Sequence, residues 1–277
     1  MIGGHLFGWA AMLGLAMPAS GGPAARPQWV VDGAGARCSL SRSLEGEPAA
    51  TFVLRGHPQA EPLEILLVGS DWGERVKANV LVTLTLQPNG EVYKRRAEFM
   101  SLGDLGKALD LDLFPRKLLD DLSKATSFTV SVDGRQLAGY ALPTAAKAVD
   151  TFEYCEREKL VEWGADRASF DAGAAVPKPV GNYPAWLTYA DVREGLTSFT
   201  VGTIRTMLAA RLTIGADGHV EGCELIEESG NKRLDAIACR LLAKRGQYEP
   251  ARDSSGKPLR SVVVYRTNWA LETRYDG

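Results

Sequence analysis

Four cysteines are the residues of this chain whose number and spacing could support chemistry. Cys38 and Cys155 lie in the first part of the sequence, and Cys223 and Cys239 lie in the last part. None of the spacings forms a C-x-x-C motif and no histidine is spaced as a paired ligand, which argues against structural zinc. An even number of cysteines in an exported chain is typical of disulfides, with thiol-redox or metal chemistry as the alternative. We therefore expect one bridge in each half, Cys38–Cys155 and Cys223–Cys239, and no metal or cofactor.

Histidines and carboxylates offer little for acid–base catalysis. His57 stands before a proline and His219 follows an Asp-Gly turn, so both are expected to be exposed loop residues. No Gly-x-Ser-x-Gly nucleophile motif is present. The neighbouring carboxylates of Asp120-Asp121 and Glu227-Glu228 point in different directions on a helix or strand, so we expect them on solvated faces. The sequence therefore favours a protein that is not an enzyme, and an exported thiol-redox or hydrolytic enzyme is the least favoured alternative.

The charge balance and the first residues bear on partners and location. The 277 residues carry 32 basic and 34 acidic side chains, a net charge of -2, without the basic excess that binding to nucleic acid needs. Residues 1–21 contain an apolar run, Leu6–Ala16, and end in small residues, as a secretory signal does. We expect a periplasmic protein if this segment is cleaved. If the segment is kept as an anchor, we expect an inner-membrane protein that faces the periplasm.

Residues 29–164 are expected to form an α+β domain. Apolar residues alternate along 76–86, and Pro88-Asn89-Gly90 then turns the chain into a partner strand. Asp133-Gly134, between two further alternating runs, indicates a second hairpin. After Thr144, a suitable N-cap, apolar residues at helical spacing predict a helix.

Residues 165–182 are rich in Ala, Gly and Pro, which marks a boundary between compact units. In polyproline form, at about 3.1 Å per residue, this segment would reach only about 55 Å. That length separates two domains but is short for a spacer across an envelope. We therefore expect a linker here, followed by a second domain at residues 183–277.

The sequence of the second domain predicts a definite order of secondary-structure elements. From Leu212 to Trp269 the chain reads as a strand, an Asp217-Gly218 turn, a strand, a helix, a turn and a final strand. Ser229 or Asn231 is available to cap the start of the helix. Its inner face is predicted from apolar residues at helical spacing: Leu234, Ile237, Ala238, Leu241 and Leu242.

This order resembles the TonB C-terminal domain family over about residues 183–271. Short motifs carry the resemblance: Tyr183-Pro184, Asp217-Gly218, Ser229-Gly230, Leu234-Asp235, Tyr248-Glu249-Pro250-Ala251 and Gly256-Lys257-Pro258. The resemblance implies a small antiparallel sheet with helices packed on one face. The chain departs from the family in a longer insertion at residues 186–206, which leaves the start of the sheet open.

In this family the terminal domain pairs with a short extended segment of an outer-membrane receptor, by strand addition. The resemblance places such a site on the final strand, at Val262, Val263, Val264, Tyr265 and Arg266. The alternative is a final strand that is central in the sheet or covered by the N-terminal domain. Tyr183 belongs to an aromatic group with Trp186, Tyr189 and Phe199, which either covers an open side of the sheet or lines a partner groove. We count Tyr183 among the candidate partner-binding residues.

The leading hypothesis is a TonB-like periplasmic protein that acts by protein–protein contact, in energy coupling of outer-membrane transport through a TonB-dependent receptor. Family members that work in this way have an inner-membrane anchor and a long proline-rich rod, whereas this chain has a globular domain in place of the rod. The alternative is therefore a stand-alone envelope adaptor without energy coupling. Edge-to-edge pairing of two terminal domains as a homodimer is left open.

Overall fold

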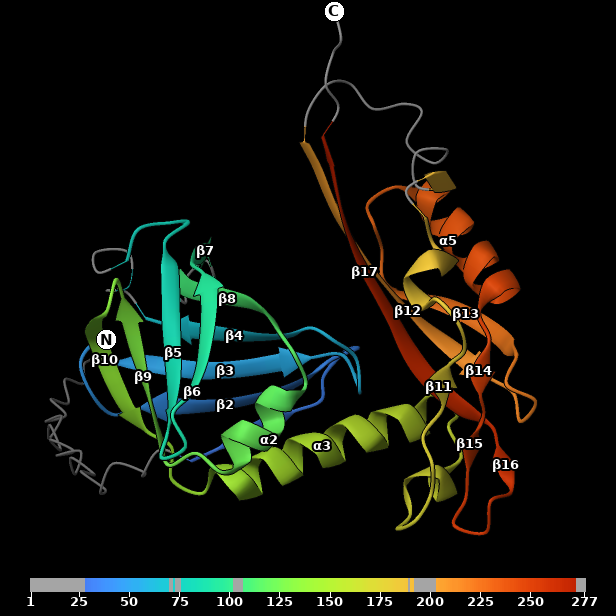
Figure 1. The fold of residues 1–277 in the computed structure, drawn as a ribbon, viewed down its shortest axis with the longest axis horizontal. Helices are drawn as coiled ribbons and strands as arrows, with labels where there is room; N and C mark the ends of the chain where they lie inside the picture. Colours follow the sequence, from blue (N-terminus) through green and yellow to red (C-terminus); the bar gives the residue numbers. More distant parts are fainter. Residues whose placement is uncertain are drawn as a thin grey trace, which may run out of the picture.

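The computed structural model describes residues 28–69, 72, 76–101, 107–188, 190–191 and 203–272. The expected signal or anchor at residues 1–21 lies outside this range. The chain is α+β, as expected, and each strand pairing that the structure shows is antiparallel (Figure 1). Within the described ranges no helix is both long and apolar enough to cross a bilayer. Below, the N-terminal part means residues 28–164 and the C-terminal part means residues 203–272.

The N-terminal part contains a six-stranded sheet. Its strands lie in the order β1 (Val30–Asp32), β2 (Cys38–Leu44), β3 (Ala50–Gly56), β4 (Leu63–Val68), β8 (Lys107–Phe114) and β7 (Glu98–Ser101). Burial alternates along β3 because successive side chains of a strand point to opposite faces. In contrast, β4 is buried without interruption from Leu63 to Leu67, and this run includes the carboxylate of Glu64.

A four-stranded sheet packs against the first one. Its order is β10 (Arg135–Ala141), β9 (Ser127–Val132), β5 (Leu81–Gln87) and β6 (Glu91–Arg96). Both expected hairpins are confirmed, and Asp133 and Gly134 take the left-handed φ values of 51° and 77° that a tight two-residue turn needs. The strand expected over residues 76–86 begins only at Leu81, because residues 77–80 turn and Asn79 has a φ of 64°.

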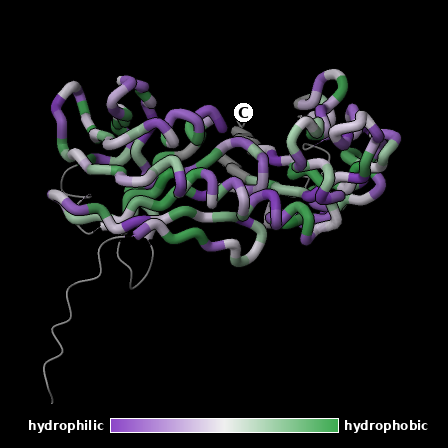
Figure 2. Tube along the Cα trace, turned by 90° about the horizontal axis from the view of Figure 1, so that it is seen from below, coloured by the Kyte–Doolittle hydropathy of each residue, from purple (hydrophilic) through white to green (hydrophobic). Residues whose placement is uncertain are grey.

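The core of the N-terminal part lies between the two sheets. The rings of Phe52 on β3 and Phe128 on β9 lie 5.8 Å apart, between centroids. Helices α2 (Lys117–Ser123) and α3 (Ala145–Glu162) add buried residues to the same core. The hydropathy colouring shows hydrophobic stretches inside this part and hydrophilic stretches along its outer turns (Figure 2).

Helix α3 is long and connects the two parts of the molecule. It starts after Thr144, which adopts a left-handed φ of 59° and donates its hydroxyl to the Pro143 carbonyl oxygen, so the expected side-chain cap is not formed. A disulfide between Cys38 and Cys155 fixes α3 to β2. From there α3 continues to β17 of the C-terminal part, with which it is in contact (Figure 1).

The C-terminal part is built on a three-stranded sheet. Its order is β13 (Val220–Glu227), β12 (Thr203–Ile214) and β17 (Ser261–Glu272). Helix α5 (Lys232–Arg245) packs its apolar side chains on the face that carries Leu208 and Leu212. Asn231 caps α5 by accepting hydrogen bonds from the backbone N–H groups of Arg233 and Leu234. A disulfide between Cys223 and Cys239 joins β13 to α5, so all four cysteines are paired in the way expected.

Residues 165–182 differ from the extended spacer expected from their composition. The segment contains a 3-10 helix, η2 (Arg167–Phe170), and a short strand, β11 (Lys178–Pro179), that pairs with β14 (Tyr248–Glu249). Ala175 also forms an antiparallel bridge with Arg252 in β15 (Ala251–Arg252), which pairs with β16 (Pro258–Leu259). The segment therefore lies along the C-terminal part, where its backbone finds hydrogen-bond partners.

Gly218 in the Asp-Gly turn offers a strong test of the C-terminal fold. Its φ is +86°, and a Cβ at this position would collide with the carbonyl oxygen of Tyr248. We expect Gly218→Ala to lower the free energy of unfolding by about 2 kcal/mol, from backbone strain and the collision together. Gly256→Ala is the matched control, since Gly256 has a φ of +87° with open space around it. Urea unfolding of both variants checks this, and equal losses would show that the contact with Tyr248 is unimportant.

Candidate functional site

The strand expected to meet a partner, β17, lies at one edge of the C-terminal sheet. It pairs with β12 along all 12 of its residues, and the sheet order ends with it. Figure 1 shows β17 on the side of this sheet that faces the N-terminal part. Val262–Arg266 therefore belong to an edge strand and not to the middle of the sheet.

One hydrogen bond just before β17 shows which backbone groups of this strand point outward. The Asp166 N–H donates to the Arg260 carbonyl oxygen at 3.0 Å, and farther along the strand the Arg266 N–H lies near the Tyr183 hydroxyl. Along an antiparallel strand, residues whose backbone groups point away from the neighbouring strand alternate with those that pair. The N–H and C=O groups of Val262 and Val264 therefore also point outward, between these two contacts. Both residues are nonetheless buried, at 3% and 8% exposed.

The side chains of the same residues are covered by the N-terminal part, which was the alternative to an exposed edge. Val264 packs with Ala209 and with Ala60 from the loop after β3, and Val262 packs with Leu160 of α3. Contact with a partner at this point would therefore involve the backbone, because these side chains are already packed.

Tyr183 lies against the opposite face of the strand. Residues 183–186 form a 3-10 helix, η3 (Tyr183–Trp186), which brings the Tyr183 ring to 4.9 Å from Tyr265 and 5.0 Å from Trp186, between centroids. Burial raises the pKa of Tyr183 and the neighbouring Tyr265 adds to this rise, while the Arg266 N–H opposes it. Tyr183 thus covers the sheet and lies beside the N–H of Arg266. Tyr189 and Phe199, expected in the same group, lie outside the described residues.

Arg266 takes part in a buried ionic network and does not flank a free edge. The carboxylate of Glu64 on β4 forms ion pairs with three arginines. Its oxygens lie 2.5 Å from Arg55 Nε, 3.4 Å from Arg37 Nη1 and 3.3 Å from Arg266 Nη2. The side chains of Glu64 and Arg266 are only 7% and 3% exposed. Burial raises the pKa of Glu64. The charges of Arg55, Arg37 and Arg266 lower this pKa by more than burial raises it, so the net shift is downward. The ionised carboxylate therefore holds β17 to the N-terminal part.

A second carboxylate extends the network to β13. Glu227 lies with Oε2 3.1 Å from His57 Nε2, and its other oxygen accepts a hydrogen bond from Arg37. His57 is 1% exposed, and its Nδ1 lies 3.3 Å from the Ala36 carbonyl oxygen. Burial raises the pKa of Glu227, but His57 and then Arg37 outweigh it and lower the pKa to about 2. Arg37 thus bridges Glu64 and Glu227, which lie on different sheets.

The pH dependence of stability tests this arrangement. Because folding lowers the pKa of Glu227 from 4.5 to about 2, its ionised form stabilises the folded chain above pH 4.5, and that stabilisation is lost as the pH falls toward 2. Allowing for partial solvent screening, we expect the loss to be about 2 kcal/mol. Glu227→Gln is therefore expected to unfold with a shallower dependence on pH between 4.5 and 2 than the parent chain. Glu228→Gln, at the exposed neighbouring position, should keep the parent slope; a parent slope in both variants would contradict the assignment.

Several of these residues were not expected from the sequence. His57 was expected in an exposed loop and is buried, and Glu227 was expected on a solvated face and is ion-paired. Asp121 was also expected to be solvated, but it is buried and accepts hydrogen bonds from Tyr93 and Lys117. One signal was available for Glu64, because it interrupts the apolar run of β4. An acidic residue in a buried strand indicates a charged partner.

The part of the chain that the structure describes contains no group of three or more His, Cys, Asp or Glu side chains placed to hold a metal ion. What the geometry does define is a class of domain: a small antiparallel sheet covered by a helix, with β17 as one of its edge strands. A family model described as Gram-negative bacterial TonB protein C-terminal matches residues 207–271. The resemblance to this family is thus confirmed over those residues, which form less than half of the chain. No curated protein and no solved structure matches the chain.

Proposed function

We propose that this chain acts in the Gram-negative cell envelope by protein–protein contact, and that β17 accepts an extended segment of its partner as an added strand. The observation that carries the proposal is the outward-facing backbone of Val262 and Val264 on an edge strand. Backbone hydrogen bonds supply much of the affinity in strand addition, so covered side chains do not prevent it. The match to the TonB C-terminal family supports the proposal, because domains of that family transduce energy and are not enzymes.

The proposal includes the domain boundaries expected from the sequence. Residues 29–164 would form the N-terminal domain, residues 165–182 the connection and residues 183–277 the TonB-like domain, after a signal or anchor at residues 1–21. Separate apolar clusters in the two parts support this division. The ionic network around Glu64 would then hold the two domains together.

The partner we propose first is a TonB-dependent outer-membrane receptor, met in the periplasm. A second function, an envelope adaptor without energy coupling, is favoured by a specific observation. Residues 165–182 bond along the C-terminal part, and the N-terminal part packs on the sheet, so the described chain shows no extended spacer between them.

Binding of synthetic peptides tests the strand-addition site. The probes are peptides copied from the periplasmic N-terminal segments of TonB-dependent receptors, each made with free or with N-methylated alternate amides. We expect the free form to bind saturably in isothermal titration calorimetry. We expect the methylated form to bind with at least about tenfold lower affinity, since each missing N–H removes a hydrogen bond between the strands. Equal binding of both forms would contradict strand addition. Binding of a receptor peptide without any receptor-dependent transport in cells would favour the adaptor.

Tyr183 is expected to compete with an added strand, because its hydroxyl lies near the Arg266 N–H. Tyr183→Phe keeps the ring packing on Tyr265 and removes that hydroxyl. We expect the variant to bind the receptor peptide a few-fold more tightly, because the hydroxyl no longer competes for about one hydrogen bond of the partner. Tyr154→Phe, on the exposed surface of α3, is the matched control and should leave the dissociation constant unchanged. Weaker binding by Tyr183→Phe would show that the hydroxyl assists the partner.

A further inference from the structure

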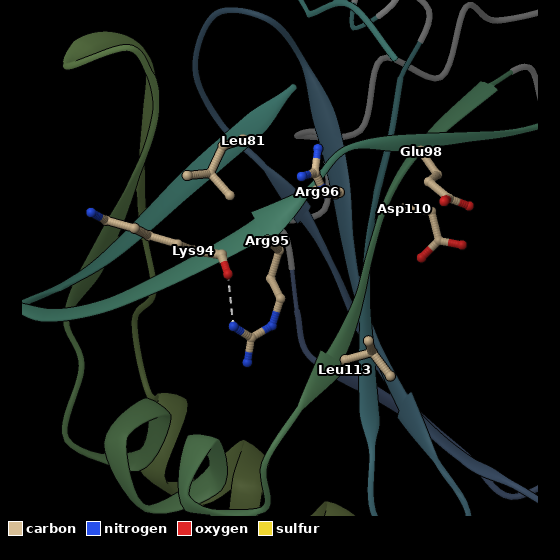
Figure 3. A pocket seen from close by; sticks show the side chains of 7 residues that line it. All are labelled: Leu81, Lys94, Arg95, Arg96, Glu98, Asp110 and Leu113. Carbon is tan, nitrogen blue, oxygen red and sulfur yellow. Dashed lines mark hydrogen bonds between the residues drawn. The ribbon is translucent and has the colours of Figure 1, made fainter. Parts of the chain in front are cut away.

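A groove opens in the N-terminal part where its two sheets separate. It lies between β6, the last strand of the four-stranded sheet, and β7 and β8 of the six-stranded sheet (Figure 3). Its volume is about 550 Å³, which is within the usual range for ligand sites. Seven of the described residues line it: Leu81, Lys94, Arg95, Arg96, Glu98, Asp110 and Leu113.

One wall of the groove is the edge of a sheet. Strand β6 pairs with β5 on one side, and the sheet order ends with β6 on the other. The Lys94 carbonyl oxygen accepts a hydrogen bond of 2.8 Å from Arg95 Nη1, as Figure 3 shows. The Arg95 side chain thus donates to a backbone carbonyl oxygen, as the backbone N–H of a neighbouring strand would. An added strand would therefore replace this side-chain bond at the Lys94 carbonyl oxygen.

Two leucines expose apolar surface on opposite walls of this groove. Leu81 of β5 is 48% exposed and Leu113 of β8 is 57% exposed. Leu113 has a φ of +66°, which L residues rarely adopt, and the pairing of β4 with β8 shifts register near it. Such an irregularity turns a side chain away from the direction that the regular strand would give it. A strained backbone that places an apolar side chain at a groove indicates a binding role.

The charges of the groove favour an acidic occupant. Among the described residues that line it, three successive residues of β6, Lys94, Arg95 and Arg96, are basic, and Glu98 and Asp110 are acidic. The Arg95 guanidinium lies 4.5 Å from the centre of the Phe114 ring, which fixes it in place. The cations exceed the carboxylates, and the apolar surface of the two leucines lies beside them.

We propose that the groove between β6 and β8 binds an extended acidic peptide segment of a protein partner. The segment adds to β6 as a strand, places apolar side chains on Leu113, and directs acidic side chains to Lys94 and Arg96. This site is separate from β17, so the two sites can fail independently.

A designed peptide tests the site. The probe is a fluorescein-labelled peptide of four Leu-Glu repeats, followed by fluorescence anisotropy, with four Leu-Lys repeats as the charge control. We expect saturable binding of the Leu-Glu peptide alone, and binding at least about tenfold weaker in the Lys94→Glu/Arg96→Glu variant. Arg135→Glu on β10, the opposite edge of the same sheet, is the matched control and should bind as the parent does. The proposal is overturned if no binding is seen up to about 1 mM peptide, a range in which even weak complexes form. It is also overturned if the Arg135→Glu control loses as much affinity as the Lys94→Glu/Arg96→Glu variant.

Two further measurements separate recognition at this groove from general effects of charge. Leu113→Asn places a residue that tolerates positive φ at the strained position, so we expect weaker peptide binding with no loss of thermal stability. Hydrogen exchange of the β6 amides is expected to slow when the Leu-Glu peptide is added, while that of β10 and β17 is unchanged. Protection at β17 instead, equal affinity after N-methylation of the peptide, or self-association of the chain through β6 would each overturn this proposal.

Discussion

Glu64→Gln is expected to lower the free energy of unfolding by about 4 kcal/mol, because it leaves three arginines around a buried site without their carboxylate. Gln keeps the shape of the side chain, so the loss reports charge and not packing. We expect the largest destabilisation at Arg266, because its side chain is only 3% exposed. Its remaining partners are the Pro62 carbonyl oxygen and Met207 Sδ. Chemical denaturation at neutral pH and low ionic strength measures the change.

The control for this substitution is Glu224→Gln on β13. Glu224 is ion-paired with Arg211, but its side chain is 61% exposed, and exposed pairs of this kind contribute less than about 1 kcal/mol. A loss for Glu64→Gln as small as that for Glu224→Gln would contradict the view that the Glu64 network holds the N-terminal part to β17.

Removal of the Cys38–Cys155 bridge is expected to cost about 4 to 5 kcal/mol of stability, and removal of the Cys223–Cys239 bridge about 3 kcal/mol. The reason is the length of chain that each bridge closes in the unfolded state: the cysteines are 117 positions apart in the first case and 16 in the second. Paired Cys→Ala double variants, unfolded in urea under identical conditions, measure both losses.

The order of the two losses is the informative result. A larger loss for the Cys223–Cys239 variant would show that the contact between α5 and β13 matters more than chain entropy. Loss of the Cys38–Cys155 bridge is also expected to loosen α3 from β2, and hence from β17.

The local elements of the fold were largely predictable from the sequence. Asp133-Gly134 predicted a hairpin because few residues other than Gly, Asn and Asp adopt left-handed φ values in tight turns, and the structure has that hairpin. The apolar stripe of α5 and its Asn231 cap were predicted for similar reasons, since spacing and side-chain chemistry act within a few residues.

The contacts between the two parts were not predictable in the same way. Arg266 and Glu64 are separated by 202 positions, and neither carries a local sign that it meets the other. His57 precedes a proline, as many exposed loop residues do, yet the turn that follows it places Ala60 against Val264 and buries the imidazole. Residues 165–182 have the composition of a linker, but composition does not show where a backbone finds hydrogen-bond partners.

The most direct test of the proposed partner site is amide hydrogen exchange, followed by NMR, at Val262 and Val264 with and without a receptor-derived peptide. Their N–H groups point away from β12, so we expect their exchange to slow by about tenfold or more when a partner strand accepts them. Amides of β13, at the opposite edge of the same sheet, should exchange at an unchanged rate. Unchanged exchange at Val262 and Val264 under saturating peptide, or slowing only at β13, would contradict strand addition at β17.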